Sequence, residues 1–330
     1  MNKFLLSGSW LDDILTSTMN EIPQTQFEGN PLVSILVTSY NYEQYLRKCI
    51  DSALNQSYSP VEIVVVDDGS TDSSKEIIAS YGKRIIPIHQ NNKGTAAAFN
   101  AAFSASHGEV ICRLDSDDYF FPEKVARAVD IFQSYPQIAW FFHQLRIVDR
   151  NGKQLKETRL KRTGKLDLRE HIIKTGLMPI GNTCGSGLCF SRSLLQKMYP
   201  LPDNSKLSVT ERYLKAVACA TAEGFFDGQP LAALRIHGRN IFSGSQNKKK
   251  LSKIVHITIS NAYWLRKNWP ILRRYSNKTL GQGLGISKRI GAIDQNHINL
   301  LNEYLSSAAF QDRLEVKLFS LYYRYFWRLR

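Results

Sequence analysis

The sequence has few cysteines and no long apolar run. Its five cysteines are an odd number without paired C-x-x-C spacing, which argues against a disulfide framework and against a zinc site. No segment reaches the ~18 to 20 uninterrupted apolar residues of a membrane span. The N-terminus, MNKFLLSGSWLDDIL, has only a short apolar patch before two acids, unlike a signal peptide. These absences predict a cytoplasmic protein, either soluble or peripheral at the inner face of the cell membrane.

Glycine-rich loops that cradle phosphates are also missing. Neither G-x-G-x-x-G nor G-x-x-x-x-G-K-[ST] follows the first predicted strand, which disfavours a dinucleotide-type Rossmann site and a P-loop. Without such a loop, a diphosphate is naturally held through a metal ion, with two or so carboxylates and the phosphate oxygens as ligands.

The composition allows a large folded body with an unevenly placed charge. The chain has 330 residues, 43% of them apolar and 22% charged, which suits one large or two modest domains. Its net charge is +14, yet residues 246–330 alone hold sixteen Lys or Arg against four Asp or Glu. This basic tail predicts contact with an anionic surface. Specific nucleic-acid binding is not predicted, because no recognisable binding module is present and charge alone supports only salt-sensitive contact.

From residue 31 onward, predicted strands alternate with predicted helices. Buried β runs occur at LVSILVTSY, VEIVVVD, RIIPIHQ and EVICRL, and helical spacing occurs at EQYLRKCIDSALNQ, SSKEIIASYG and KGTAAAFNAAFSAS. The alternation predicts an α/β fold with a mostly parallel central sheet flanked by helices. Ligands of such sheets bind outside the carboxyl ends of the strands. Thr38, Tyr40, Asp67 and Asp68 fall at these ends, as do the acids that follow EVICRL.

Three carboxylates crowd into four positions in EVICRLDSDDYFFPEKV, namely Asp115, Asp117 and Asp118. Carboxylates this close repel one another unless a cation or solvent compensates. One interpretation is a polar turn between strand and helix, with Pro122 and Glu123 at the helix start. The other is a D-x-D motif that binds Mg²⁺ or Mn²⁺.

The order and spacing of several motifs resemble family 2 glycosyltransferases, which are inverting, nucleotide-sugar-dependent enzymes of the GT-A fold. The motifs are SILVTSYNYEQYLRKCIDSALNQSYSPVEIVVVDDGSTD, NNKGTAAAFNAAFSASHGEVICRLDSDD and PLAALRIHGRN. The resemblance extends from residue 31 to residue 240, about two-thirds of the chain. The resemblance implies a catalytic domain at 31–245, with a Rossmann-like nucleotide-binding half (31–120) and an acceptor-binding half (121–245). An N-terminal extension (1–30) would precede it, and a helical basic C-terminal region (246–330) would follow.

The resemblance also implies roles for single residues. Asp68 would accept a hydrogen bond from the ring N–H of a uracil-like base, and Glu211 would be the catalytic base at a place where relatives generally carry Asp. The metal, Mg²⁺ or Mn²⁺, would be held by Asp117 with Asp115 and His237. The residues expected around the nucleotide sugar are Thr38, Tyr40, Asp68, Asn92, Lys93, Gly94, Asn100, Asp115, Ser116, Gly185, Ser186, Gly187 and Arg235.

The implied activity is metal-dependent transfer of a sugar, from a UDP-linked donor, to a hydroxyl of a saccharide or glycoconjugate acceptor. Polysaccharide or glycoconjugate synthesis is the expected setting. The alternative is a non-catalytic GT-A-like protein that binds a nucleotide sugar or scaffolds an assembly. The change from Asp to Glu at Glu211 favours that alternative, and the intact acids at Asp68, Asp115 and Asp117 count against it.

Several of these residues also have simpler structural interpretations. Glu211 suits the first turn of a helix, with Thr210 as a cap. A lone histidine such as His237 is more often packed or exposed than a ligand. The charged stretch 150–170 predicts a solvated surface hairpin or loop in preference to an acceptor-binding flap.

The C-terminal segment DRLEVKLFSLYYRYFWRLR predicts an amphipathic helix. A basic stripe runs beside an apolar one, so the helix could lie in an anionic membrane interface. Alternatively, its apolar side could pack on the catalytic domain. The basic stripe is Arg313, Lys317, Arg324 and Arg328, and the apolar stripe is Leu314, Leu318, Leu321, Tyr325 and Leu329.

Overall fold

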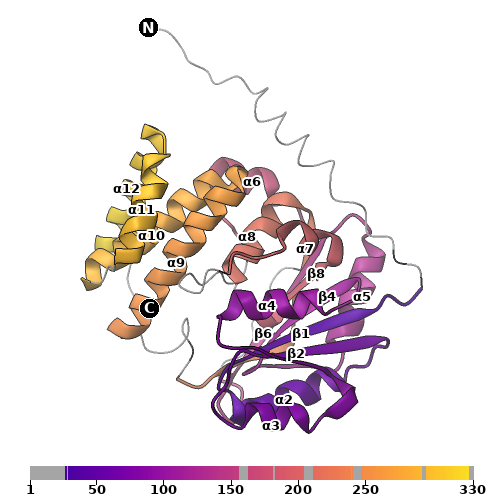
Figure 1. Cartoon of the computed structure of the whole chain (residues 1–330). Helices are drawn as coiled ribbons and strands as arrows, with labels where there is room; N and C mark the ends of the chain where they lie inside the picture. Colours follow the sequence, from indigo (N-terminus) through magenta and orange to yellow (C-terminus); the bar gives the residue numbers. More distant parts are fainter. Residues whose placement is uncertain are drawn as a thin grey trace.

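A nine-stranded mixed sheet forms the centre of the molecule (Figure 1). The computed structural model describes residues 27, 29–155, 163–180, 183–203, 211–238, 240, 247–291 and 295–326. The first four strands are all parallel and lie in the order β3-β2-β1-β4. They are β1 (Val33–Ser39), β2 (Val61–Asp67), β3 (Ile86–His89) and β4 (Val110–Asp115).

The second half of the sheet mixes strand directions. β8 (Leu188–Ser191) runs antiparallel between β4 and β6 (Trp140–Asp149), and β9 (Gly224–Ile236) runs parallel to β6. The short strands β5 (Tyr119–Phe120) and β7 (Gly164–Leu166) pair antiparallel with β9. Within the charged stretch 150–170, residues 156–162 lie outside the described residues, so the prediction of a solvated hairpin or loop stays a prediction.

Helices cover both faces of the sheet, as the sequence predicts. In β1, Val33, Ile35 and Val37 belong to one buried cluster, whereas Leu36 belongs to another, because successive side chains point to opposite faces. The first cluster packs against α2 (Glu43–Leu54), α3 (Ser74–Ala79) and α5 (Lys124–Ser134). The second packs against α4 (Thr95–Ser104), α6 (Arg169–Thr175), α7 (Arg192–Met198) and α8 (Glu211–Thr221). The predicted α/β class is therefore confirmed.

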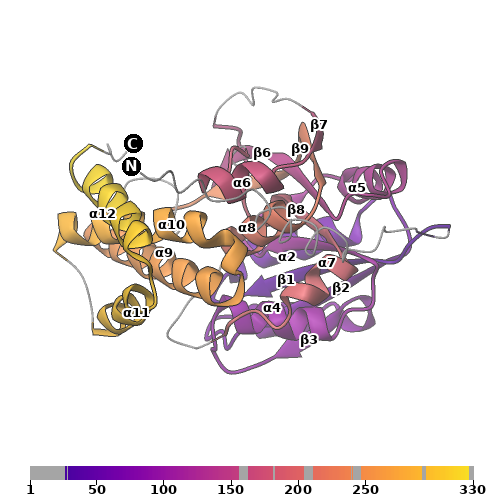
Figure 2. The same ribbon diagram turned by 90° about the horizontal axis from the view of Figure 1, so that it is seen from above.

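Four further helices stand to one side of the sheet (Figures 1 and 2). They are α9 (Lys248–Asn268), α10 (Arg273–Ile290), α11 (Gln295–Ser306) and α12 (Phe310–Tyr325), and they share a small core of their own. Leu265, Leu272 and Tyr275 also join the cluster that contains α4 and α8, so this helical region is packed onto the body. The predicted helical C-terminal region is confirmed. None of the helices in the described part of the chain is long and apolar enough to cross a membrane.

Candidate functional site

The carboxyl ends of β1, β2 and β4 lie side by side, which forms the rim that the sequence predicts. In the strand register, Thr38 stands beside Asp115, and Ser39 stands beside Asp67. Tyr40 follows β1 and is exposed. The side chains that end these three strands are therefore neighbours although they are far apart in the sequence.

Asp68 holds a loop against this rim. Its Oδ1 accepts hydrogen bonds from Gln90 Nε2 (2.6 Å) and from the backbone N–H of Lys93 (2.9 Å), and its Oδ2 accepts one from Gly94 N (2.9 Å). The loop also approaches Gly69, where a Cβ would lie 2.7 Å from Asn92 N and where φ is +78°. The structure thus brings Asp68 together with Asn92, Lys93 and Gly94. The Asp68 carboxylate itself hydrogen-bonds to the backbone of this loop, and the sequence analysis did not predict these hydrogen bonds.

Asn100, predicted to lie near the nucleotide sugar, is instead hydrogen-bonded to the chain after α7. Its side-chain Nδ2 donates to Leu201 O and its Oδ1 accepts from Leu201 N, both at 2.8 Å. The residue is buried, so the amide fixes the chain that follows α7 onto α4. The structure does not bring the Asn100 side chain into the acidic cluster.

The third acid of the cluster, Asp118, is a buried connector. It accepts hydrogen bonds from Ser186 Oγ (2.6 Å) and Arg235 N (2.9 Å), so it ties the end of β4 to two later segments. Burial raises the pKa of Asp118 well above its usual range, and the charges of Asp117 and Asp115 add to the shift. The turn interpretation therefore holds for Asp118, which supports the frame of the site.

Asp115 and Glu211 meet around a buried arginine. Arg113 Nη2 lies 2.7 Å from Asp115 Oδ1, and Arg113 Nη1 lies 3.8 Å from Glu211 Oε2. Burial raises the pKa of Asp115 to about 6 against the opposing effect of Arg113, and the nearby charges of Asp117 and Glu211 contribute. Sequence reasoning missed Arg113, although a charged residue inside the buried run EVICRL was a signal that could have found it.

The turn at Gly185–Gly187 packs directly on these charged groups. Gly185 N donates to Glu211 Oε2 at 2.7 Å, which orients the carboxylate at the start of α8. A Cβ on Gly185 would clash with Asp115 Oδ2 and would lie 2.9 Å from the guanidinium carbon of Arg113, so a side chain here would displace the Arg113–Asp115 pair. Ser186 Oγ accepts from Asp115 N (3.1 Å), while Ser116 is buried between the acids. Thr210, the suggested cap of α8, lies outside the described residues.

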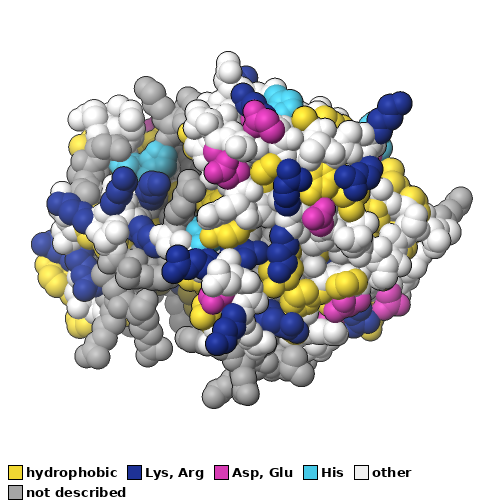
Figure 3. All heavy atoms as spheres, turned by 90° about the horizontal axis from the view of Figure 1, so that it is seen from below, with side chains coloured by type: hydrophobic (Ala, Val, Ile, Leu, Met, Phe, Trp, Pro, Cys, Tyr) yellow, Lys and Arg dark blue, Asp and Glu magenta, His cyan; other side chains and the backbone are white. Residues whose placement is uncertain are grey.

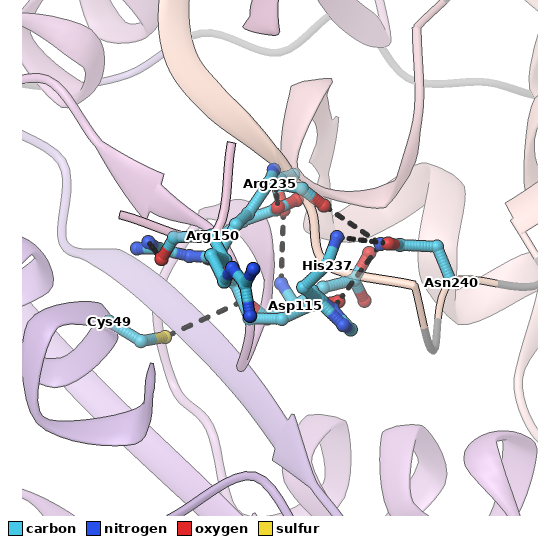
Figure 4. Close-up of polar contacts among 9 residues, drawn as sticks. Cys49, Asp115, Arg150, Arg235, His237 and Asn240 are labelled. Atoms are coloured by element: carbon cyan, nitrogen blue, oxygen red, sulfur yellow. Dashed lines mark hydrogen bonds and ion pairs between the residues drawn. The ribbon is translucent and has the colours of Figure 1, made fainter. Parts of the chain in front are cut away.

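Asp117 and His237 form a hydrogen-bonded pair in the site, and Figure 4 shows His237 between Asp115 and Asn240. His237 Nε2 and Asp117 Oδ2 lie 2.8 Å apart and share a hydrogen bond. The imidazole packs against the rings of Tyr45 and Tyr42, with centroids 5.0 and 5.6 Å away. Asn240 completes the arrangement, because its Oδ1 accepts from His237 N at 2.8 Å. Asn240 was not among the predicted site residues, although it ends the quoted motif PLAALRIHGRN.

Arg235 supports this pair from behind. Its Nε donates to Asp117 O and its Nη1 donates to Arg150 O, each at 2.8 Å (Figure 4). The guanidinium also lies over the ring of Tyr45, 4.6 Å from its centroid, and the residue is buried. The structure therefore brings Arg235 to the site, where its fork of donors fixes the backbone at Asp117.

The predicted metal ligands are only partly assembled. Among the described residues, no three His, Cys, Asp or Glu side chains are grouped so that they could hold a metal ion by themselves. Asp117 and His237 are in contact, whereas Asp115 pairs with Arg113. A carboxylate and an imidazole fit a divalent cation whose other ligands are diphosphate oxygens and water, since such cations commonly bind proteins through few side chains and a phosphate.

Known proteins resemble this chain in sequence and in fold. The family model described as Glycosyl transferase family 2 matches residues 34–198, half of the chain. An uncharacterized glycosyltransferase of Nostoc sp. is 39% identical over 178 residues, which cover 51% of this chain and 53% of that protein. Chondroitin synthase of Escherichia coli is 38% identical over 125 residues, which cover 37% and 18%. The matched part is thus about half of the first relative's length and less than a fifth of the second's.

The fold has a solved counterpart in TarS of S. aureus. The crystal structure of TarS 1–349 in complex with UDP-GlcNAc gives a TM-score of 0.55, with 90% of this chain and 93% of that chain covered. Only 19% of the residues are identical, so this likeness concerns the fold, and it confirms the expected GT-A type. With the family match to residues 34–198, we conclude that the chain belongs to glycosyl transferase family 2.

Proposed function

We propose that this chain is an inverting glycosyltransferase, which moves a sugar from a UDP-linked donor to a hydroxyl of a saccharide or glycoconjugate acceptor. The observation that carries the proposal is the placement of a partly exposed carboxylate, Glu211, next to the acidic end of β4. Asp117, which is paired with His237, follows Asp115 by two residues. Asp115 in turn lies beside Thr38 of the rim, where the nucleotide would bind. A synthase of a polysaccharide among the relatives supports polysaccharide or glycoconjugate synthesis as the setting.

The donor would bind at the rim. Thr38, Tyr40 and Asp68 would contact the base, with the loop at 92–94 beside the nucleotide. Asp68 already accepts hydrogen bonds from that loop, so it would order the nucleotide site as well as contact the base. Gly185, Ser186 and Gly187 would face the sugar, because their turn lies between Asp115 and Glu211.

Glu211 would act as the general base. An inverting displacement needs a carboxylate within about 2.6–3.2 Å of the acceptor hydroxyl, on the side opposite the leaving diphosphate. The hydrogen bond from Gly185 N to Oε2 fixes the carboxylate, and Arg113 lies near the same oxygen. The side chain is 21% exposed, so it can meet an acceptor.

Asp117 and His237 would hold a Mg²⁺ or Mn²⁺ ion together with diphosphate oxygens, with Asp115 close by as a further contact to the metal or the ribose. When bound, the ion would supply the positive charge that stabilises the departing diphosphate. Arg235 and Asn240 would hold the two ligand residues in place through the bonds already described. We also propose the domain division given above, with a catalytic domain at 31–245 and a basic helical region at 246–330.

A thermal-shift experiment tests the donor site. UDP should stabilise the protein in the presence of Mg²⁺ or Mn²⁺ and much less in the presence of a chelator, because a ligand of the folded state raises its stability by roughly 2.7 kcal/mol at a hundred times its Kd. Asp117→Asn should remove most of the benefit of the metal. Asp130→Asn, an exposed acid of an i,i+3 ion pair, is the matched control and should behave as the wild type.

A turnover assay with UDP-sugars then separates catalysis from binding alone. Release of UDP is measured with and without an acceptor. A protein that binds UDP with metal and releases none from any UDP-sugar would be the non-catalytic alternative. Equal UDP binding with and without chelator would overturn the metal assignment.

A further inference from the structure

The last helix, α12, presents an apolar face to solvent. Of the twelve exposed large apolar side chains among the described residues, seven lie on α12 or directly after it. We call them the α12 apolar face: Phe310, Leu314, Leu318, Leu321, Tyr322, Tyr325 and Phe326. Their exposed fractions run from 41% to 79%, so the apolar side chains are concentrated on one element of the surface.

Specific contacts fix this orientation of α12. Gly281 and Gly285 of α10 let the opposite face approach closely, since a Cβ on Gly285 would lie 2.7 Å from Tyr323 Cβ. Val316 and Ser320 are buried on this side. The alternative that Leu314, Leu318, Leu321 and Tyr325 pack on the catalytic domain is therefore contradicted, because these side chains are exposed and α12 buries other residues against α10. Arg328 and Leu329 lie outside the described residues.

The acids of α12 also belong to the buried side. Asp312 accepts from Asn277 Nδ2 (2.9 Å) and from Arg266 Nη2 (3.2 Å). Glu315 lies 3.2 Å from Arg274 Nη2. These pairs draw both carboxylates toward α9 and α10, so the acids in the described part of α12 are directed away from its apolar face.

Basic side chains form one border of that face. Arg313, Lys317 and Arg324 are exposed, and their spacing of four and seven residues places them in one row along a helix of 3.6 residues per turn. The row lies between the apolar face and the buried face. On the face seen in Figure 3, the charged side chains of the left-hand part, where the helical region lies, are mostly Lys and Arg, whereas both signs occur elsewhere.

We propose that α12 docks on an anionic membrane surface and lies in the plane of the interface. The leucines would enter the boundary of the acyl chains, the aromatic rings at the end of the helix would sit among the headgroups, and the basic row would meet lipid phosphates. A second copy of this chain fits the α12 apolar face less well. If two α12 helices met, neither would have an exposed acid to pair with the basic row of the other.

Vesicle sedimentation of the full chain tests this docking. We expect binding to phosphatidylcholine vesicles that contain about a third phosphatidylglycerol, weakening with salt, and little binding to pure phosphatidylcholine. The triple variants Leu314→Ser/Leu318→Ser/Leu321→Ser and Arg313→Glu/Lys317→Glu/Arg324→Glu should each lose at least tenfold in affinity. The matched control, Leu155→Ser/Leu177→Ser, removes two leucines of similar exposure elsewhere and should bind as the wild type.

Three results would overturn the proposal. The first is wild-type protein that ignores anionic vesicles. The second is a leucine variant that binds as well as the wild type, since charge alone would then account for the contact. The third is a wild-type dimer in sedimentation equilibrium that dissociates in the leucine variant, with no vesicle binding, which would assign the face to self-association. Circular dichroism melting of every variant establishes that the fold is intact.

Discussion

The rim of the sheet and the α12 face use their side chains in opposite ways. At the rim the side chains are polar, and several of them are already hydrogen-bonded within the chain. Asp118 ties three segments together, Asp68 orders a loop, and Asn100 fixes a connection. On α12 the exposed face is apolar and bordered by exposed Lys and Arg, and the two acids of the helix point inward. Residues of a binding motif can thus serve mainly to hold other segments of the chain in place. A surface that carries no such motif can still present a continuous exposed apolar face.

The frame at the rim leaves a small set of groups in reach of solvent. The side chains of Asp117, Glu211 and Asp115 are 15%, 21% and 28% exposed, whereas Asp118 is almost fully buried. Arg113 and Arg235 are buried next to these carboxylates. They place positive charge there and leave the carboxylates partly exposed. We therefore expect substitutions at the exposed carboxylates to affect chemistry and substitutions in the frame to affect stability.

The largest expected effect is on turnover, from Glu211→Gln. The amide keeps the shape of the side chain but cannot accept the proton of the acceptor hydroxyl, so kcat should fall roughly 10²-fold or more while the affinity for the nucleotide sugar stays near that of the wild type. Initial rates of UDP release and a UDP-sugar titration measure the two quantities. Glu211→Asp should also be impaired, because the shorter side chain misplaces the oxygen.

Glu170→Gln serves as the control, since Glu170 is an exposed glutamate in the first turn of α6. It should leave both quantities unchanged. If Glu211→Gln transfers sugar at a near-normal rate, Glu211 is only a residue of the helix start, and the rim contains no general base at this position.

Much of the fold follows from local pattern. The apolar runs of β1, β2 and β4 and the helical spacing of α2 and α4 are visible in the sequence, because a buried parallel sheet needs them. The tail was also predicted to be helical. The direction in which α12 faces was not predictable, since it depends on the close approach at Gly281 and Gly285 of another helix.

The positions of the site residues in the fold were predictable from the chain order of the motifs, with Asp115 at the end of a strand and Glu211 at the start of a helix. The bonding of these residues was not. Sequence reasoning treated Asn100 and Arg235 as ligand contacts, while their side chains hold the backbone of Leu201, Asp117 and Arg150. Such partners come from segments up to 118 positions apart, and periodicity carries no information about them.

A smaller effect concerns the body beneath the rim, where His143 of β6 is fully buried. Burial, with the charge of Lys124, lowers the pKa of His143 to about 3. The unfolded chain binds a proton near pH 6.5 and the folded chain does not, so this contribution to stability is complete above pH 6.5 and is lost as the pH falls toward 3. Between pH 7 and pH 5 the loss should be about 2 kcal/mol.

Urea unfolding at several pH values measures this loss. His143→Gln should flatten the pH dependence in that window, and His107→Gln, which removes an exposed histidine, should leave it as in the wild type. An unchanged slope in His143→Gln would show that His143 takes up its proton in the folded protein.

The smallest expected effect comes from a substitution in α9, and it tests whether the sheet and the C-terminal helical region unfold together. Asn247 caps α9, because its Oδ1 accepts from Lys250 N at 2.9 Å, and Asn247→Ala should cost about 1 kcal/mol. Leu265 and Leu272 join the helical region to the core of the body, so the loss should appear in one urea transition that is the same by circular dichroism and by tryptophan fluorescence. Asn302→Ala, at an exposed position inside α11, should cause no loss, since alanine is the better helix former. A separate, earlier transition in Asn247→Ala would mean that the helical region and the body are independent units, and that α12 can leave the body without unfolding the rim.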